Sequence, residues 1–139
     1  MIKVFTDGGS RGNPGPSAFG FLVKYDGRLL IEEGGYLGIA TNNFAEYTAV
    51  IEALTWLERV YPKSGVHIYM DSQLAVSQLS GVYKVKNSKI RERIFAIRIL
   101  ETSFAKVSYH FIPREQNREA DRLVNLALDR HLKTKRDGV

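Results

Sequence analysis

The hydrophobic pattern of this sequence changes after its third apolar run, and that change most constrains the fold. Residues 2–6, 19–25 and 29–36 are short runs rich in β-branched and aromatic side chains, which is typical of strands. Asp26-Gly27 separates the second run from the third and predicts a tight β-hairpin. Apolar residues then recur at the spacing of a helix face, and helices and strands alternate to the end of the chain. The pattern therefore predicts an α/β domain with a mixed sheet.

The second part of the chain contains four predicted helices and two predicted strands. Asn42 or Asn43 is expected to cap the first helix, which ends before Pro62. The remaining elements are expected at residues 66–70 (strand), 73–79 (helix), 88–101 (helix), 107–112 (strand) and 117–132 (helix). Strands that alternate with helices should join the first strand in parallel, through right-handed crossovers. Residues 1–139 are expected to form a single domain, with 133–139 as a frayed basic tail.

Composition excludes several classes of function. With 139 residues the chain can bury a hydrophobic core without disulfide bonds, and it has no cysteine. A disulfide framework, a thiolate zinc site and a cysteine nucleophile are therefore excluded, and a reducing compartment is expected. The N-terminus reads as a strand and not as a signal peptide, and no apolar run approaches the roughly 20 residues of a membrane span. We expect a cytoplasmic protein.

The charge balance favours a polyanionic partner. The formal net charge is +5 and the pI about 9.5, which suits phosphate binding, although solubility alone would also explain it. Between Lys84 and Arg98 there are six basic residues and one acid, and the tail adds four more basic residues. These stretches supply candidate phosphate contacts.

Four acids are candidates for the chemistry. Asp7 and Asp71 each follow a predicted strand, and ligands of open α/β sheets bind where parallel strands end. Glu46 and Asp121 lie near helix N-termini, where an acid often only compensates the helix dipole. Crowded carboxylates repel one another unless cations hold them, and all-oxygen donors suit Mg²⁺ or Mn²⁺. Two such ions about 4 Å apart can activate a water and stabilise a leaving oxygen during phosphodiester cleavage.

Four ordered motifs carry a resemblance to a known family. They are Thr6-Asp7-Gly8-Gly9-Ser10 with Gly12-Asn13-Pro14-Gly15, Thr41-Asn42-Asn43-Phe44-Ala45-Glu46, Asp71-Ser72-Gln73, and Asn117-Arg118-Glu119-Ala120-Asp121. In their order and spacing they resemble type 1 ribonuclease H over nearly the whole chain.

This resemblance implies a ribonuclease H-like fold, a five-stranded mixed sheet flanked by helices. It also implies an endonuclease that cuts the RNA strand of RNA–DNA hybrids and leaves 5′-phosphate and 3′-hydroxyl ends. Asp7, Glu46, Asp71 and Asp121 match the family's metal-binding acids, which hold two ions, Mg²⁺ or Mn²⁺. In such enzymes the residue matched by Glu46 also lies near a ribose 2′-hydroxyl, the group that distinguishes RNA from DNA.

The resemblance also implies substrate contacts. Asn13 and Thr41 match residues that seat a phosphate of the DNA strand, and Asn42, Asn43 and Gln73 match polar residues that face the minor groove. Each has a structural alternative, since Asn13 precedes a proline in a turn and Thr41 or Asn42 can cap a helix.

The sequence departs from the family in two places. Many relatives carry a histidine in the loop before the last helix, but here residues 113–116 contain none. Arg114 or Glu115 is the candidate replacement, while His110 reads as an ordinary strand residue. The second departure is the absence of a basic protrusion. The residues expected to bind the substrate phosphates instead are Lys84, Lys86, Lys89 and Arg91.

Two other functions remain open at this level. One is a catalytically inactive hybrid- or duplex-binding module of the same fold, and the other is a different nuclease of the wider superfamily, such as an integrase or junction resolvase. The four acids together argue against the first, and Asn13, Thr41 and Gln73 against the second. The expected partner is an RNA–DNA hybrid, with duplex RNA left open, and the expected state is a monomer without membrane contact.

Overall fold

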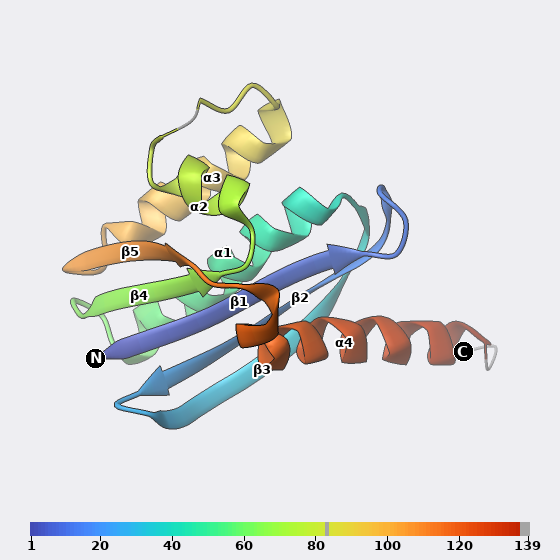
Figure 1. Cartoon of the computed structure of the whole chain (residues 1–139), viewed down its shortest axis with the longest axis horizontal. Coiled ribbons are helices and arrows are strands. Elements are labelled where there is room, and N and C mark those ends of the chain that lie inside the picture. The colour runs from blue at the N-terminus through green and yellow to red at the C-terminus, as the bar shows by residue number, and fades with distance from the viewer. Residues whose placement is uncertain (83, 137–139) are drawn as a thin grey trace.

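A computed structural model describes residues 1–82 and 84–136, and one five-stranded sheet of order β3-β2-β1-β4-β5 organises them (Figure 1). β1 pairs antiparallel with β2, β2 with β3, while β4 and β5 run parallel to β1. The strands are β1 (Ile2–Ser10), β2 (Gly15–Tyr25), β3 (Arg28–Ala40), β4 (Gly65–Met70) and β5 (Lys106–Phe111). The predicted mixed sheet and its parallel crossovers are confirmed.

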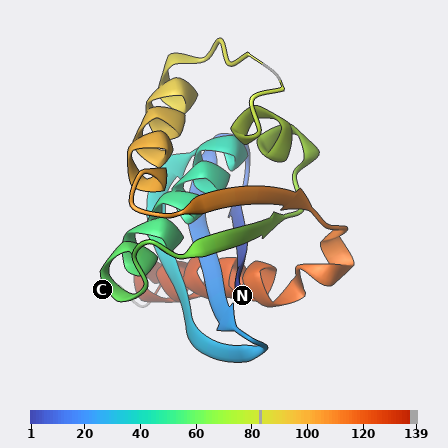
Figure 2. The same ribbon diagram turned by 90° about the vertical axis from the view of Figure 1, so that its left-hand side faces the viewer.

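The helices lie on both faces of the sheet (Figures 1 and 2). They are α1 (Asn42–Val60), α2 (Gln73–Leu79), α3 (Ser88–Glu101) and α4 (Arg118–Arg136), with a short 3-10 turn, η1 (Arg114–Gln116), before α4. Alternate strand residues point to opposite faces, so Phe21 packs in the core with α1, whereas Leu22 packs against α4. None of these helices is both long and apolar enough to span a membrane.

α4 covers only part of its face. It contacts β1, β2 and β3, so on the described part of the chain the α4 side of β4 and β5 has no helix over it. The hairpin between β2 and β3 turns at Asp26 (φ 48°) and Gly27 (φ 83°), the pair of positive φ values that a two-residue type I′ turn requires.

Several predicted boundaries were wrong, and β2 begins at Gly15 and β3 ends at Ala40, so both strands are longer than the expected ranges 19–25 and 29–36. β1 does not end at Asp7 but continues to Ser10, because Gly8, Gly9 and Ser10 stay paired with β2 after the pairing with β4 has stopped at Phe5. The cap of α1 is Thr41, whose hydroxyl accepts a hydrogen bond from the Phe44 amide (3.2 Å). Asn42 and Asn43 instead form the first turn of the helix.

The last helix is longer than predicted. Residues 133–136, expected to be frayed, continue α4, whereas 137–139 lie outside the described residues. The helices at 73–79 and 88–101 begin and end where the sequence predicted.

Candidate active site

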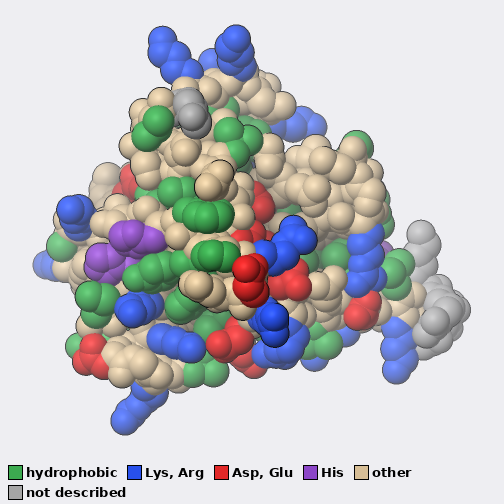
Figure 3. Space-filling model, viewed as in Figure 1, with side chains coloured by type: hydrophobic (Ala, Val, Ile, Leu, Met, Phe, Trp, Pro, Cys, Tyr) green, Lys and Arg blue, Asp and Glu red, His purple; other side chains and the backbone are tan. Residues whose placement is uncertain are grey.

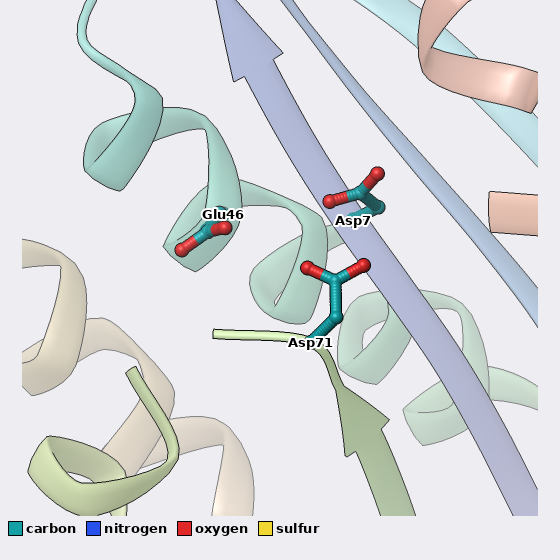
Figure 4. Close-up of side chains that lie close together, drawn as sticks. All are labelled: Asp7, Glu46 and Asp71. Carbon is teal, nitrogen blue, oxygen red and sulfur yellow. The ribbon is translucent and has the colours of Figure 1, made fainter. Parts of the chain in front are cut away.

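Three carboxylates from three different elements meet at one point (Figure 4). Asp7 lies on β1, Glu46 on the second turn of α1, and Asp71 directly after β4. One oxygen from each of the three lies within 4.8 Å of the others. β1 and β4 are parallel neighbours, and this places Asp7 beside Asp71 as the strand-end argument predicted.

The absence of a side chain at Gly8 on β1 allows the helix that carries Glu46 to lie close to the sheet. A Cβ on Gly8 would lie 2.2 Å from the Ala45 carbonyl carbon, so only glycine lets α1 lie this close to β1. Gly20 does the same for α4, because a Cβ there would lie 2.7 Å from the Ala120 carbonyl oxygen. These two contacts bring the helices that carry Glu46 and Asp121 against the sheet.

Asp121 joins the same pocket without completing the tight group of three. The pocket has a volume of about 320 Å³ and is lined by all four predicted acids, with Asn42, Arg11 and Arg114 at its edges. The charge of Asp121 also raises the pKa of Asp7, so the two groups interact electrostatically. The first turn of α4 therefore places Asp121 at the border of the carboxylate group.

Burial and mutual repulsion both disfavour negative charge at this centre. Burial, followed by the charges of Asp71, Glu46 and Asp121, raises the pKa of Asp7 to about 8, against a weak opposing hydrogen bond from the Gly8 amide. Burial raises the pKa of Glu46 to about 7, where Asp71 adds to the shift while a hydrogen bond with Ser72 and the charge of Arg114 oppose it. Without a bound cation, the pKa values of Asp7 and Glu46 therefore lie close to neutral pH.

This donor set fits a hard divalent cation. Its ligand atoms are carboxylate oxygens, with no sulfur, and a bound cation would return the raised pKa values of Asp7 and Glu46 toward the ionised range. The four acids are the residues that would hold such an ion.

Asn117 is a residue whose role the sequence did not reveal. Its side chain is 1% exposed, and its amide donates to the Thr6 carbonyl (2.8 Å) and to Asp71 Oδ2 (3.1 Å). It thereby ties the start of α4 to β1 and fixes the orientation of one carboxylate. Only its position four residues before Asp121 in the quoted motif hinted at this role.

Some of the predicted substrate residues converge on a second feature, a groove next to the carboxylates. The groove has a volume of about 730 Å³ and lies between the start of α1 and the segment before α3. Its lining includes Asn13, Thr41, Asn43, Lys86 and Lys89. The candidate DNA-strand contacts and two candidate basic contacts therefore share one surface.

The other predicted contacts lie around this groove. Asn42 lines the carboxylate pocket instead, where its Oδ1 accepts hydrogen bonds from the Ser10 amide (2.8 Å) and hydroxyl (3.2 Å). Gln73 is exposed at the start of α2, and Lys84 and Arg91 are exposed on either side of the groove-lining lysines. These placements leave each side chain accessible to a ligand.

The loop that lacks a histidine places Arg114 at the carboxylate pocket. Arg114 lines the pocket and lowers the pKa of Glu46 through its charge, whereas Glu115 lies outside it, in the adjoining surface hollow. Of the two candidates for the loop role, the structure therefore favours Arg114 by position.

Comparison with known proteins agrees with this geometry. Residues 5–127 match the family model described as "Reverse transcriptase-like". Among solved structures, LC11 ribonuclease H1 in complex with an RNA/DNA hybrid is 40% identical with a TM-score of 0.91, over 95% of this chain and 99% of that one. Ribonuclease H1 of Halobacterium salinarum is 39% identical with a TM-score of 0.88, over 92% and 97% of the two chains.

The curated relatives include longer proteins. A bifunctional protein of Mycobacterium tuberculosis is 37% identical over 92% of this chain, but the match spans only 35% of that protein. Ribonuclease HI of Halobacterium salinarum is 40% identical, and the match spans 64% of its length. Ribonuclease H of Hydrogenovibrio crunogenus is 32% identical over 92% of this chain and 95% of its own. The fold, the four ordered acids and these relatives together show that this chain belongs to the type 1 ribonuclease H family.

Proposed function

We propose that this protein is a metal-dependent endonuclease that hydrolyses the RNA strand of RNA–DNA hybrids and leaves 5′-phosphate and 3′-hydroxyl ends. The observation that carries the proposal is the convergence of Asp7, Glu46 and Asp71 within 4.8 Å, with Asp121 on the same pocket. A relative that is 40% identical over 99% of its length has been solved with an RNA/DNA hybrid. The surface around the acids is lined by amides, hydroxyls and lysines, the groups that bind a nucleic-acid backbone without reading its bases.

Each acid has a separable task in this proposal. Asp7 and Asp71, on adjacent parallel strands, form the rigid part of the ion-binding centre, and Asp121 adds a ligand from α4. Two divalent ions, Mg²⁺ or Mn²⁺, would supply an activated water and charge stabilisation for the departing 3′-oxygen. Glu46 lines the carboxylate pocket, where it helps to hold the ions and also accepts a hydrogen bond from the ribose 2′-hydroxyl, a contact that a deoxyribose strand cannot make.

In this proposal the DNA strand lies in the groove. Asn13 and Thr41 both form hydrogen bonds at the N-terminus of α1. Asn13 Oδ1 accepts a hydrogen bond from the Asn42 amide (3.1 Å), and Thr41 caps the helix. A phosphate at this helix N-terminus gains from the helix dipole, and Lys86 and Lys89 add full positive charges on the opposite wall. Asn43 and Gln73 contact the minor groove between the two strands.

Arg114 takes the place of the family's loop histidine in this proposal. Its guanidinium lies at the edge of the carboxylate pocket and is always charged, so it holds the phosphate that leaves with the cleaved strand without needing to titrate. The protein acts as a monomer in a reducing compartment, the cytoplasm, in keeping with the absence of cysteine.

A single substrate panel tests the activity. End-labelled hybrid, duplex RNA, duplex DNA and single strands are each incubated with Mg²⁺, with Mn²⁺ and with chelator. We expect cleavage of the RNA strand of the hybrid only when an ion is present. Cleavage that survives chelation, or a preference for duplex DNA, would refute the proposal and favour another nuclease of the superfamily.

The Asp7→Asn variant separates the enzyme from a binding module. It should lose hybrid cleavage while its hybrid dissociation constant stays within about threefold of the parent, because the groove residues remain in place. Equal cleavage by the variant and the parent protein would show that Asp7 is not part of the centre. A parent protein that binds hybrid but cuts with neither ion would identify the inactive module.

A further inference from the structure

Two histidines lie side by side on the sheet face that α4 leaves uncovered. His67 comes from β4 and His110 from β5, and His67 Nδ1 lies 2.9 Å from His110 Nε2. Both side chains are partly exposed, and Figure 3 shows histidine side chains gathered at the surface over these two strands. This pair takes no part in the carboxylate centre.

Stacked neighbours hold the two rings in place. The His110 ring stacks against both His67 (centroids 5.1 Å apart) and Tyr69 (5.0 Å), and Tyr69 in turn stacks on Phe5 (5.2 Å). The parallel register pairs Tyr69 with His110 and His67 with Ser108, so all of these side chains point to the same face. Because these contacts already restrict both rings, an ion that binds the two nitrogens costs little side-chain entropy.

The spacing of the two nitrogens matches that of two ligands on one metal ion. Metal–imidazole bonds of about 2.0–2.1 Å at angles between 90° and tetrahedral place two nitrogens about 3 Å apart. We propose that His67 and His110 form a two-imidazole site for a borderline transition-metal ion (Cu²⁺, Ni²⁺ or Zn²⁺), independent of the carboxylate centre. Burial and the neighbouring His67 lower the pKa of His110, which keeps the nitrogen lone pair of that ring available at neutral pH.

The chemistry of the two sites separates the ions they accept. Imidazole nitrogen prefers borderline ions, while the carboxylate oxygens of Asp7, Glu46 and Asp71 prefer hard ones. The charged neighbours on the histidine face are Lys3, whose ammonium lies 5.9 Å from the Tyr69 ring centre, and Lys106 on β5. Asp7 is the acid of β1 on this face, and it lies beyond Phe5, at the carboxylate centre, so water would complete the coordination of an ion held by the two imidazole nitrogens.

An ion at this pair would cross-link β4 to β5. These strands form the end of the sheet, and β4 leads directly to Asp71. A ligand that binds only the folded state raises the melting temperature in proportion to the logarithm of its concentration. The site is therefore expected to stabilise β4, the strand that leads directly to Asp71.

Electron paramagnetic resonance with substoichiometric Cu²⁺ tests the site directly. The full chain should show superhyperfine splitting from two imidazole nitrogens, and either His67→Asn or His110→Asn should abolish the two-nitrogen signal. His131→Asn is the matched control, since His131 lies on α4, where it stacks on Tyr36 of β3, and its replacement should leave the signal unchanged. A two-nitrogen spectrum that persists in His67→Asn and His110→Asn would overturn the proposal.

Thermal melting with Ni²⁺ provides a second, independent readout. With saturating Mg²⁺ present to occupy the carboxylates, a hundredfold excess of Ni²⁺ over its dissociation constant should raise the melting temperature by about 3 °C or more at pH 7.5. The rise should vanish in both histidine variants, persist in His131→Asn, and weaken as the pH is lowered, because protons compete with the ion for imidazole nitrogen. No rise in the parent protein, or an equal rise in the His67→Asn variant, would show that the pair binds no metal.

Discussion

Asp7 is the residue at which stability and function oppose each other most directly. Its pKa is raised from 3.8 to about 8 by burial and by the neighbouring acids, so the folded protein holds this proton more tightly than the unfolded chain does. Between those two values the unfolded state binds fewer protons than the folded state. In the absence of metal, the free energy of unfolding therefore falls as pH rises from about 4 to 8.

The Asp7→Asn variant should remove this pH-dependent loss. In EDTA we expect little difference in stability from the parent near pH 4, and an advantage of about 2 kcal/mol or more at pH 9, since each pKa unit corresponds to about 1.4 kcal/mol. Urea denaturation at both pH values measures it, with Glu92→Gln, an exposed acid on α3, as the control. Equal stability of Asp7→Asn and the parent at pH 9 would show that the negative charge of Asp7 does not destabilise the folded protein.

Although Asn117 is buried, we expect its side chain to affect the binding of ions at Asp71. Asn117→Ala removes the donor to Asp71 Oδ2 and to the Thr6 carbonyl, leaving a buried carbonyl unpaired. We expect a loss of about 1–3 kcal/mol in stability and a 10- to 100-fold weaker Mn²⁺ affinity by calorimetry. Unchanged Mn²⁺ affinity in a folded variant would limit Asn117 to a structural role.

At the scale of elements, close approach between β1 and α1 creates the site. Gly8→Ala would place a methyl group 2.2 Å from the Ala45 carbonyl carbon, so α1 must move away and carry Glu46 with it. We expect about 2 kcal/mol or more of destabilisation and a loss of hybrid cleavage. Gly65→Ala, on β4, is the matched control because no atom lies within 4 Å of the added carbon. Equal melting temperatures for the two variants would contradict this account.

The elements also show what a sequence can reveal. Helices α2 and α3 were predicted to the residue, because Ser72 and Asn87 are side-chain caps followed by regular apolar spacing. The end of β1 was missed, since a glycine pair reads as a turn unless the neighbouring β2 and the packed α1 are known. Thr41 and not an asparagine caps α1 for a similar reason, because three adjacent residues can all serve as caps.

The residues of the candidate site differ in how far the sequence alone predicted their roles. Strand-end position alone marked Asp7 and Asp71, whereas Glu46 and Asp121 needed the family resemblance, since an acid at a helix start has a simpler explanation. The hydrogen bonds of Asn117 with Asp71 and of Ser72 with Glu46 could not be predicted, because they join segments that are distant in the sequence. Periodicity identifies elements, but contacts between elements decide which polar residues act together.

For the whole molecule, the distribution of charge should decide how tightly the hybrid is held. The net charge is +5, and Lys86 and Lys89 line the groove beside Asn13 and Thr41. Each lysine that contacts a phosphate releases a counterion on binding, so it contributes close to one unit to the slope of log affinity against log salt. Basic residues elsewhere on the surface should contribute much less.

Replacing both groove lysines by alanine should therefore reduce that slope by about 1–2 and raise KM for the hybrid, with kcat changed less than threefold. Hybrid affinity measured by fluorescence anisotropy from 50 to 300 mM salt gives the slope, and steady-state cleavage gives KM and kcat. The matched control replaces Arg28 and Arg59, exposed residues on the β2–β3 hairpin and near the end of α1, and removes the same net charge away from the groove. If both double variants lower the slope equally, overall charge and not the groove holds the substrate. If only the groove variant does so, phosphates lie along Lys86 and Lys89, and the compact chain grips its substrate through the segment that precedes α3.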